Sequence, residues 1–382
     1  MEQPITQQAD PRILEASAHK REKLRAWLKA NGLDGAIISR RDNFAWITTG
    51  GDNRVINCSE MGVGHLVITP DRHYLVSHYM DSDRLMEEQV PGQGYEQVTT
   101  YWYQGDERAR ALALAGENVA ADTHFPRTHF AAEAIMDLQW PLNEIEVTRT
   151  RWLARAVGQI LEKVFREVEP GMTEREIQRQ LHSQLIRQGI DFEVAIVGSD
   201  ERIHKYRHVL ATDKPLERYL LLGPVVRKWG LFALVSRCAH FGEPPAEVQR
   251  AFQAAATIEA RIISILEESL EKGLDKGLKF SRILECQKAW YEQLGVPDGW
   301  IYHFQGGPTG YVLVDAARSL TDKAIQVPQA YSWFTTVKGA KVEEVTLLTQ
   351  NGVEIASLGE NWPLIEVDTP KGPYKVPGML IR

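Results

Sequence analysis

The sequence predicts an α/β domain followed by a larger α+β domain. Short β-rich runs separated by turns fill the first part of the chain, and paired helices alternating with strands begin after Trp140-Pro141. A length of 382 residues suits two domains better than one small core. We expect a polar leader, a first domain, a second domain and a C-terminal extension at 1–12, 13–140, 143–358 and 359–382.

The first domain opens with an expected amphipathic helix over 13–33. Leu14, Leu24 and Leu28 recur at helical spacing, and Gly32 stands where a helix C-cap would lie. Short apolar runs rich in β-formers follow, and turn residues separate them. We expect β-structure at 35–40, 44–50, 64–70 and 73–78.

The second domain begins with an expected helix from Asn143 to about Glu167. Thr173 then precedes Glu176 by three residues, the spacing of a capping box at the start of a second helix. Two helices, strands, two helices and more strands predict helices on one face of a curved antiparallel sheet. The later helices are expected at 245–271 and 278–294, and strands at 193–198, 219–226, 230–236, 309–314, 330–338 and 342–348.

Composition excludes several classes of protein. The chain has 44 Lys+Arg against 51 Asp+Glu, a net charge of −7, which gives no general attraction to nucleic acid or to anionic lipid. The N-terminal residues lack the basic and apolar regions of a signal peptide, and no run is apolar enough to cross a bilayer. We expect a cytoplasmic protein whose three cysteines are reduced and which binds neither nucleic acid nor a membrane.

Four segments of the second domain collect residues suited to chemistry. The loop after a buried-looking strand carries His204, Arg207 and His208, and imidazole is the group best suited to move protons near neutral pH. An apolar hairpin spans 220–242, and a glycine-rich segment spans 301–319. The fourth segment carries Glu343 and Glu344, whose side chains point to opposite faces if the segment is a strand.

The order and content of these segments resemble the superfamily of methionine aminopeptidase, Xaa-Pro aminopeptidase, prolidase and creatinase. The most specific pieces are the PGMTE helix start, the HxxxTD run from His208 to Asp213, the hairpin ending at Arg237, and the closing GAKVEEVTLLTQNG. The resemblance implies a creatinase-like N-terminal domain and a pita-bread catalytic domain. It covers nearly the whole chain.

The resemblance also implies a departure at the metal site. Peptidases of this group hold two divalent metals with two aspartates, one histidine and two glutamates, and four of these five positions lack a ligand here. They fall at Gly223, Leu234, Gly307 and the carboxylate-free stretch WFTTVKG, so that only Glu343 remains. Because one carboxylate does not hold a pair of dications, we expect no metal and no other cofactor.

Three functions remain open from the sequence. The first is a metal-independent hydrolase of a C–N bond in a small amino-acid-like or guanidino-type substrate, in which His208 is the general acid and base and Glu343 holds a positive charge or a water. Creatinase resembles this case, although it carries a glutamate at the position of Leu234. The second is an inactive relative that binds a ligand or a protein. The third is a metallopeptidase with displaced ligands such as His204, His240 or Asp315.

Further residues are expected to bind the substrate. The amides near Gly306 and Gly307 could receive developing negative charge. By the resemblance to creatinase-like dimers, the N-terminal domain of one subunit borders the site of the other, so a homodimer is expected. The candidate binding contacts are Arg207, His303, Gly306, Gly307, Tyr311 and Lys341, with Arg41, Phe44 and Trp46 contributed across the dimer.

Overall fold

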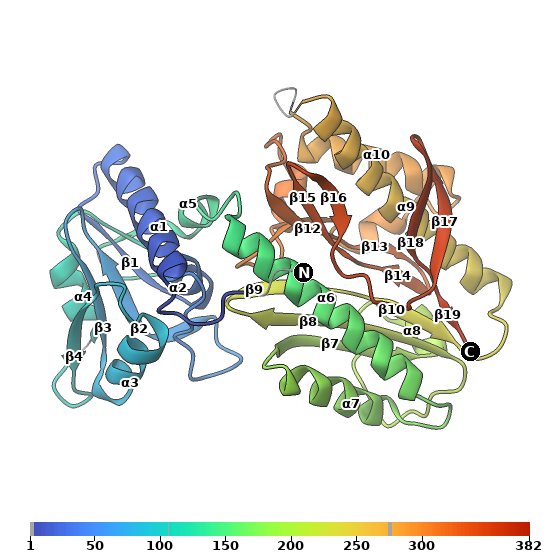
Figure 1. Cartoon of the computed structure of the whole chain (residues 1–382), viewed down its shortest axis with the longest axis horizontal. Coiled ribbons are helices and arrows are strands. Elements are labelled where there is room, and N and C mark those ends of the chain that lie inside the picture. Colours follow the sequence, from blue (N-terminus) through green and yellow to red (C-terminus); the bar gives the residue numbers. More distant parts are fainter. Residues whose placement is uncertain (1–3, 106, 274–276) are drawn as a thin grey trace. The chain divides into compact units, whose positions relative to one another are not determined.

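The computed structural model describes residues 4–105, 107–273 and 277–382. The chain divides into two compact units, one of Met1–Ile145 with Trp229–Leu231, the other of Glu146–Lys228 and Phe232–Arg382 (Figure 1). No helix among the described residues has both the length and the apolar character needed to span a bilayer.

The first unit is built on a six-stranded mixed sheet in the order β4-β3-β2-β1-β5-β6. Ile37, Val67 and Val76 lie in its core and pack against Ala111 of α4. The strands are β1 (Gly35–Arg40), β2 (Met61–Ile68), β3 (His73–His78), β4 (Glu96–Thr100), β5 (Val119–Ala121) and β6 (His129–Phe130). The helices are α1 (Pro11–Ala30), α2 (Arg41–Ile47), α3 (Tyr79–Arg84), the π-helix η1 (Leu85–Gln89), α4 (Glu107–Ala115) and α5 (Ala132–Asp137).

Two details of this unit bear on the sequence predictions. Gly32 follows the C-cap residue of α1 and has a φ of +64°, as a helix-ending glycine should. The prediction of β-structure over 44–50 is wrong, because Phe44 to Ile47 lie in α2, and every side chain of that stretch is buried. A short helix buried on all sides has no polar face, so its apolar run cannot be told from a strand by periodicity.

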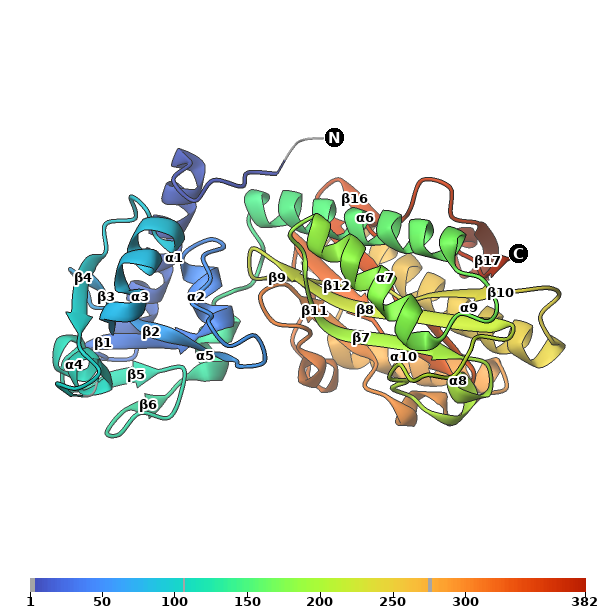
Figure 2. The same cartoon turned by 90° about the horizontal axis from the view of Figure 1, so that it is seen from below.

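The second unit combines a five-stranded and a four-stranded sheet with four long helices. The five-stranded sheet has the order β19-β10-β8-β7, with β9 paired to β8, and the four-stranded sheet has the order β11-β12-β15-β16. Figures 1 and 2 show α6 and α7 beside the first sheet and α9 and α10 beside the second. The long helices are α6 (Glu144–Glu167), α7 (Glu174–Arg187), α9 (Ala246–Glu271) and α10 (Phe280–Gln293).

The strands of this unit agree in outline with the sequence, but the strand predicted at 309–314 is wrong. Strand β11 ends at Thr309, and the backbone turns there, with the Gly310 N–H donating to the Val312 carbonyl. The first sheet holds β7 (Asp191–Ser199), β8 (Tyr219–Lys228), β9 (Leu231–Leu234), β10 (Arg237–His240) and β19 (Leu380–Ile381). The second holds β11 (Gly306–Thr309), β12 (Gln329–Trp333), β15 (Val345–Thr349) and β16 (Gly352–Ile355). The unit also has two hairpins, β13 (Thr335–Val337) with β14 (Ala340–Val342) and β17 (Leu364–Thr369) with β18 (Gly372–Pro377). Its short helices are α8 (Glu201–Lys205), η3 (Gly299–Tyr302) and η4 (Ala316–Leu320).

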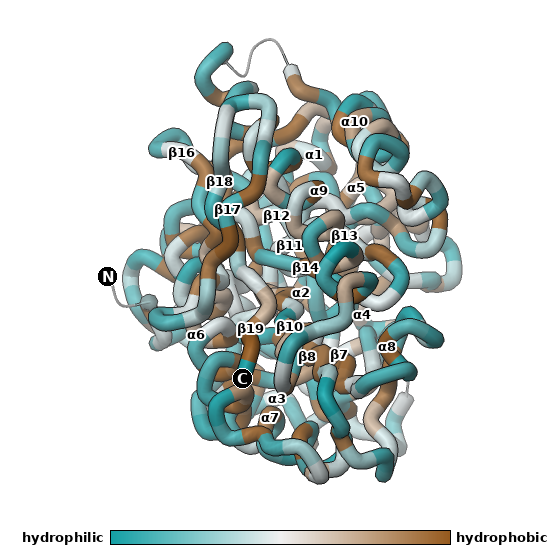
Figure 3. The backbone as a smooth tube through the Cα atoms, turned by 90° about the vertical axis from the view of Figure 1, so that its right-hand side faces the viewer, coloured by the Kyte–Doolittle hydropathy of each residue, from teal (hydrophilic) through white to brown (hydrophobic). Residues whose placement is uncertain are grey.

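The core of the second unit fixes the strands that carry the site. Every residue of β8 except Lys228 is buried, and Figure 3 shows the hydrophobic stretches of β7 and β8 close together. Helix α9 packs on β13, β14 and β17 and buries Ile258, Ile262 and Leu266. The predicted capping box is confirmed, because the Thr173 side chain accepts the backbone N–H of Glu176 while the Glu176 carboxylate accepts that of Thr173. The site therefore stands on rigid elements.

Candidate functional site

The candidate site forms where four segments of the second unit converge. His208 follows α8, His303 follows η3, and Lys341 lies on β14 with Glu343 two residues on. An antiparallel bridge from Ser236 to Glu343 joins the β9–β10 segment to the β14–β15 segment. Residues far apart in the sequence thus meet in one place.

Two histidines form the centre of the site. The Nε2 atoms of His208 and His303 are 3.3 Å apart, and their rings meet edge to face. His303 Nδ1 is 2.7 Å from the carbonyl oxygen of Phe304, which can only accept a hydrogen bond, so Nδ1 carries the proton of neutral His303. His303 Nε2 is then the acceptor, and His208 Nε2 must donate to it. This leaves His208 Nδ1 with a free lone pair.

Both imidazoles are held neutral near neutral pH. Burial lowers the pKa of His208 below its ordinary value, and the charges of Lys341 and Arg207 lower it further, although Glu343 opposes them. Burial also lowers the pKa of His303 to about 4, although the hydrogen bond from its ring to the Phe304 carbonyl acts to raise that pKa. A neutral imidazole is the form that can accept a proton as a general base.

Lys341 and Glu343 form a buried ion pair beside the histidines. Lys341 Nζ lies 2.7 Å from Glu343 Oε2, and Ser236 Oγ donates to the same oxygen at 2.8 Å. The other carboxylate oxygen, Oε1, is buried without a hydrogen-bond partner within the part of the chain that the structure describes. A buried acceptor of this kind is usually satisfied by a water or a ligand.

Phe334 links the ion pair to the histidines. Its ring stacks on His303 with centroids 5.0 Å apart, and Lys341 Nζ lies 5.3 Å from its centroid. The ring therefore supports an imidazole and gives a cation–π contact to the ammonium.

The two neighbouring glutamates face opposite ways, and neither faces solvent. Glu343 points to Ser236 and Lys341, whereas Glu344 is bound by Arg237 and by the Ser357 hydroxyl. Both carboxylates are 0% exposed. Burial raises the pKa of Glu344 despite the opposing charge of Arg237. Glu344 and Arg237 thus form a structural pair, and Glu343 alone faces the site.

The residues predicted to match the superfamily's metal positions do not fit a pair of metal ions. Leu234 packs with Val225, Phe232 and Phe334 in an apolar cluster. A Cβ added at Gly307 would lie 2.4 Å from the carbonyl oxygen of Asp315, which leaves no room there for a ligand side chain. No step of the chemistry proposed below passes through a metal.

Other potential ligands do not gather either. His240 Nδ1 contacts the carbonyl of Gly242, and Asp315 pairs with Arg318. Across residues 4–105, 107–273 and 277–382, the one group of three or more possible metal-ligating side chains is Asp200, Glu201 and Glu217. Lys214 binds all three of these carboxylates.

The remaining predicted contacts occupy varied places. Gly306 and Gly307 are buried in β11, where a side chain would collide with backbone atoms of the chain itself. Tyr311 is fully buried near Glu146 and Arg149, and burial raises the pKa of its phenol well above the ordinary value. Their contact with a substrate stays a prediction.

The predicted contacts of the first unit lie in its helix α2. Phe44 and Trp46 are buried, and the Arg41 guanidinium lies 3.4 Å from Asp52. Their contribution across a dimer stays a prediction as well.

Sequence reasoning missed Ser236 and Phe334 as parts of the site. Ser236 stands directly before Arg237 in the hairpin motif, which is the signal that could have found it. Phe334 gives no such signal, because its role depends on contacts with His303 and Lys341 that only the fold creates.

Comparisons with known proteins agree with this architecture. Residues 20–137 match the family described as creatinase/prolidase N-terminal domain, and residues 149–291 match metallopeptidase family M24. The chain belongs to the creatinase/aminopeptidase superfamily of pita-bread proteins. The M24 match ends before the glycine-rich strand β11 and the closing Lys341–Glu343 segment, so these parts lie outside the matched range.

Solved structures of this superfamily share the fold at low sequence identity. An Xaa-Pro dipeptidase from Bacillus anthracis is 16% identical, with a TM-score of 0.72 over 96% of this chain and 100% of that chain. Dipeptidase PepE from Mycobacterium ulcerans is 14% identical, with a TM-score of 0.73 over 96% and 98%. The N-terminal domain of FACT complex subunit SPT16 from Cicer arietinum is 12% identical, with a TM-score of 0.62 over 89% and 96%. No curated protein sequence matches the chain.

Proposed function

We propose that this protein is a metal-independent hydrolase that cleaves a C–N bond in a small amino-acid-like or guanidino-type substrate. The observation that carries the proposal is the hydrogen-bonded pair of His208 and His303, which leaves His208 Nδ1 as a base. The match to an M24 peptidase family supports hydrolysis as the reaction class. We further propose that the protein works as a cytoplasmic homodimer.

The proton transfers follow from the tautomer of His208. Its Nδ1 takes a proton from water as the water oxygen forms a bond to the substrate carbon. The same proton then passes to the leaving nitrogen as the C–N bond breaks, so His208 ends the cycle neutral. A well-placed group of this kind contributes about 10²–10⁴-fold in rate.

Lys341 and Glu343 complete the proposed chemistry. The Lys341 ammonium uses one donor on Glu343 and keeps two others, which can stabilise the negative charge that develops on a carbonyl oxygen. The partnerless Glu343 Oε1 can accept a hydrogen bond from a substrate amine or guanidinium. The other proposed substrate contacts are those predicted from the sequence. They are Arg207, His303, Gly306, Gly307 and Tyr311, with Arg41, Phe44 and Trp46 across the dimer.

The test is turnover by the chelator-dialysed protein and its His208→Gln variant. Amino-acid amides, guanidino acids, ureido acids and X-Pro dipeptides form the substrate panel. We expect hydrolysis of one class by the wild type and a loss of about 10²–10⁴-fold in His208→Gln. His182→Gln is the matched control, since that half-buried imidazole stacks on Phe192 away from the site, and it should retain activity. Full activity in His208→Gln would contradict the proposal.

A second function is favoured by the apolar cluster of Val225, Phe232, Leu234 and Phe334. Leu234, and Phe334 within WFTTVKG, stand where the sequence predicts the metal positions, and apolar side chains there suit a protein that binds a ligand without transforming it. Absence of turnover on every substrate class, with a ligand that still raises the melting temperature, would favour this alternative.

A further inference from the structure

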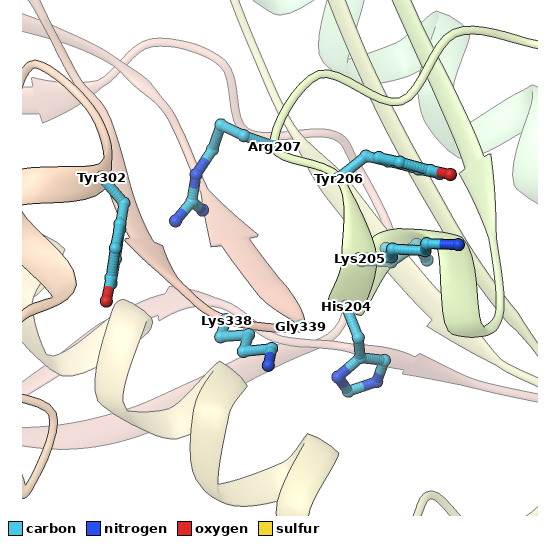
Figure 4. Close-up of a pocket in the computed structure, with 8 residues that line it drawn as sticks. His204, Lys205, Tyr206, Arg207, Tyr302, Lys338 and Gly339 are labelled. Atoms are coloured by element: carbon cyan, nitrogen blue, oxygen red, sulfur yellow. The ribbon is translucent and has the colours of Figure 1, made fainter.

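A basic cavity of about 370 Å³ lies in the second unit, and its lining includes the residues that directly precede His208 and His303 in the chain (Figure 4). Its polar lining comes from α8, the residues that follow it, η3 and the β13–β14 turn. These side chains are His204, Lys205, Tyr206, Arg207, Tyr302 and Lys338. Figure 4 shows Arg207, Tyr302 and Lys338 around a common space, while Lys205 and Tyr206 point away from it.

The lining of this cavity contains no carboxylate. This composition is unusual for a chain with a net charge of −7. Glu201 begins the same short helix, but its carboxylate lies 3.5 Å from Lys214 rather than in the lining. The cavity therefore gathers the positive charges of Arg207 and Lys338 with the Tyr302 phenol.

Arg207 is a partly buried cation in the lining of this cavity. Its side chain is partly buried, and burial lowers the pKa of its guanidinium, with only the phenols of Tyr291 and Tyr302 acting in the other direction. A desolvated cation is costly unless an anion pairs with it. The planar fork of a guanidinium fits a carboxylate or a phosphate with two parallel hydrogen bonds.

The walls of the cavity are held in place by the fold. Gly339 has a φ of +90°, and a Cβ added there would lie 2.4 Å from the His204 ring, so glycine is required for this approach. The Tyr219 hydroxyl donates to the Gly339 carbonyl at 2.9 Å. The Asp200 carboxylate accepts the backbone N–H groups of Arg218 and Tyr219, which fixes the start of α8. A site fixed before binding loses little entropy when the ligand arrives.

Arg207 relates this cavity to the catalytic centre. This residue precedes His208 in the chain, and its charge acts on both His208 and His303. We propose that the cavity binds the oxyanion end, a carboxylate or a phosphate, of an acidic substrate whose C–N bond lies at His208. The identification of the ligand as the substrate rests on the proposed function, whereas the binding of an oxyanion does not.

Calorimetric titration of the full chain with glutarate and, separately, with inorganic phosphate tests this proposal. We expect one of the two anions to bind, and its affinity to fall as the salt concentration rises. The anion that binds shows whether the site takes a carboxylate or a phosphate. Arg207→Met and Lys338→Met should each weaken binding about 10–100-fold, as expected for lost hydrogen bonds to a charged group. Arg187→Met, at the exposed end of α7, should bind like the wild type.

Two results would overturn the proposal. One is a wild type that binds neither probe at low salt. The other is an Arg207→Met variant that is folded by circular dichroism and binds with unchanged affinity. The His208→Gln variant separates this proposal from the proposed function, because it should lose turnover and keep anion binding. If that variant turns over normally while Arg207→Met loses binding, the catalytic proposal fails and the anion site stands.

Discussion

Lys341 places a positive charge next to the buried carboxylate of Glu343. Its side chain is 6% exposed, and its ammonium lies 2.7 Å from Glu343 Oε2. A buried pair of opposite charges balances itself, and removal of one partner leaves the other charge without compensation. The buried carboxylate of Glu343 therefore depends on the Lys341 ammonium.

Replacement of Lys341 by methionine should destabilise the fold by about 3–5 kcal/mol, because Glu343 would remain buried without its cation. Urea denaturation of the variant measures this loss. The double variant Lys341→Met/Glu343→Gln removes both charges and should recover part of the stability. Equal losses in the single and double variants would show that the pair does not act as a unit.

The fall of activity at acid pH should report the protonation of His208. The folded-state pKa of this base lies below the ordinary value of 6.5, so the reactive neutral form persists to lower pH than for a free imidazole. The value of kcat/KM should be constant near neutral pH and fall as pH decreases, with a midpoint below 6.5. A midpoint above 6.5 would contradict this assignment.

At the scale of elements, helix α9 carries a buried acid behind the site. Glu259 is 0% exposed, and Thr335 Oγ1 of β13 lies 3.2 Å from its Oε2. Burial raises the pKa of Glu259 well above its ordinary value, and the nearby Glu344 raises it further. The fold therefore favours the protonated form of the carboxyl that this helix presents to the strands.

Glu259→Gln should change how stability depends on pH. A folded-state pKa above the unfolded value stabilises the wild type fully below pH 4.5, and this contribution is lost as pH rises toward the folded-state pKa. The glutamine variant lacks this loss, so its advantage should grow by about 1.4 kcal/mol per pH unit above 4.5 while folded Glu259 stays protonated. Denaturation at several pH values measures it, and a difference that does not vary with pH would refute it.

Local signals in the sequence predicted most elements but not their contacts. The Thr173 capping box and the long helices follow from spacing alone, and these predictions hold. The stretch 44–50 was mistaken for a strand, because residues 44–47 of α2 are all buried and apolar and show no helical periodicity. The pair of His208 and His303 joins residues 95 positions apart, so it arises from the packing of whole elements, which local patterns do not encode.

For the molecule as a whole, the fold could be predicted from the sequence, because the order of the motifs is kept although sequence identity to the related structures is low. Segments from PGMTE to the closing strand keep the order of the superfamily, and both family matches agree with it. The basic cavity was not predicted, because Arg207, Tyr302 and Lys338 come from three separate elements. A cavity of this kind becomes visible only when those elements are placed together.

We propose that chemistry at this site needs no metal ion. Elemental analysis of the protein purified without chelator, combined with its activity before and after dialysis against a chelator, measures this directly. We predict that manganese, cobalt, zinc and iron are each far below one ion per chain and that turnover survives dialysis unchanged. About two ions per chain, with activity that is lost on dialysis and restored by the metal, would contradict the account.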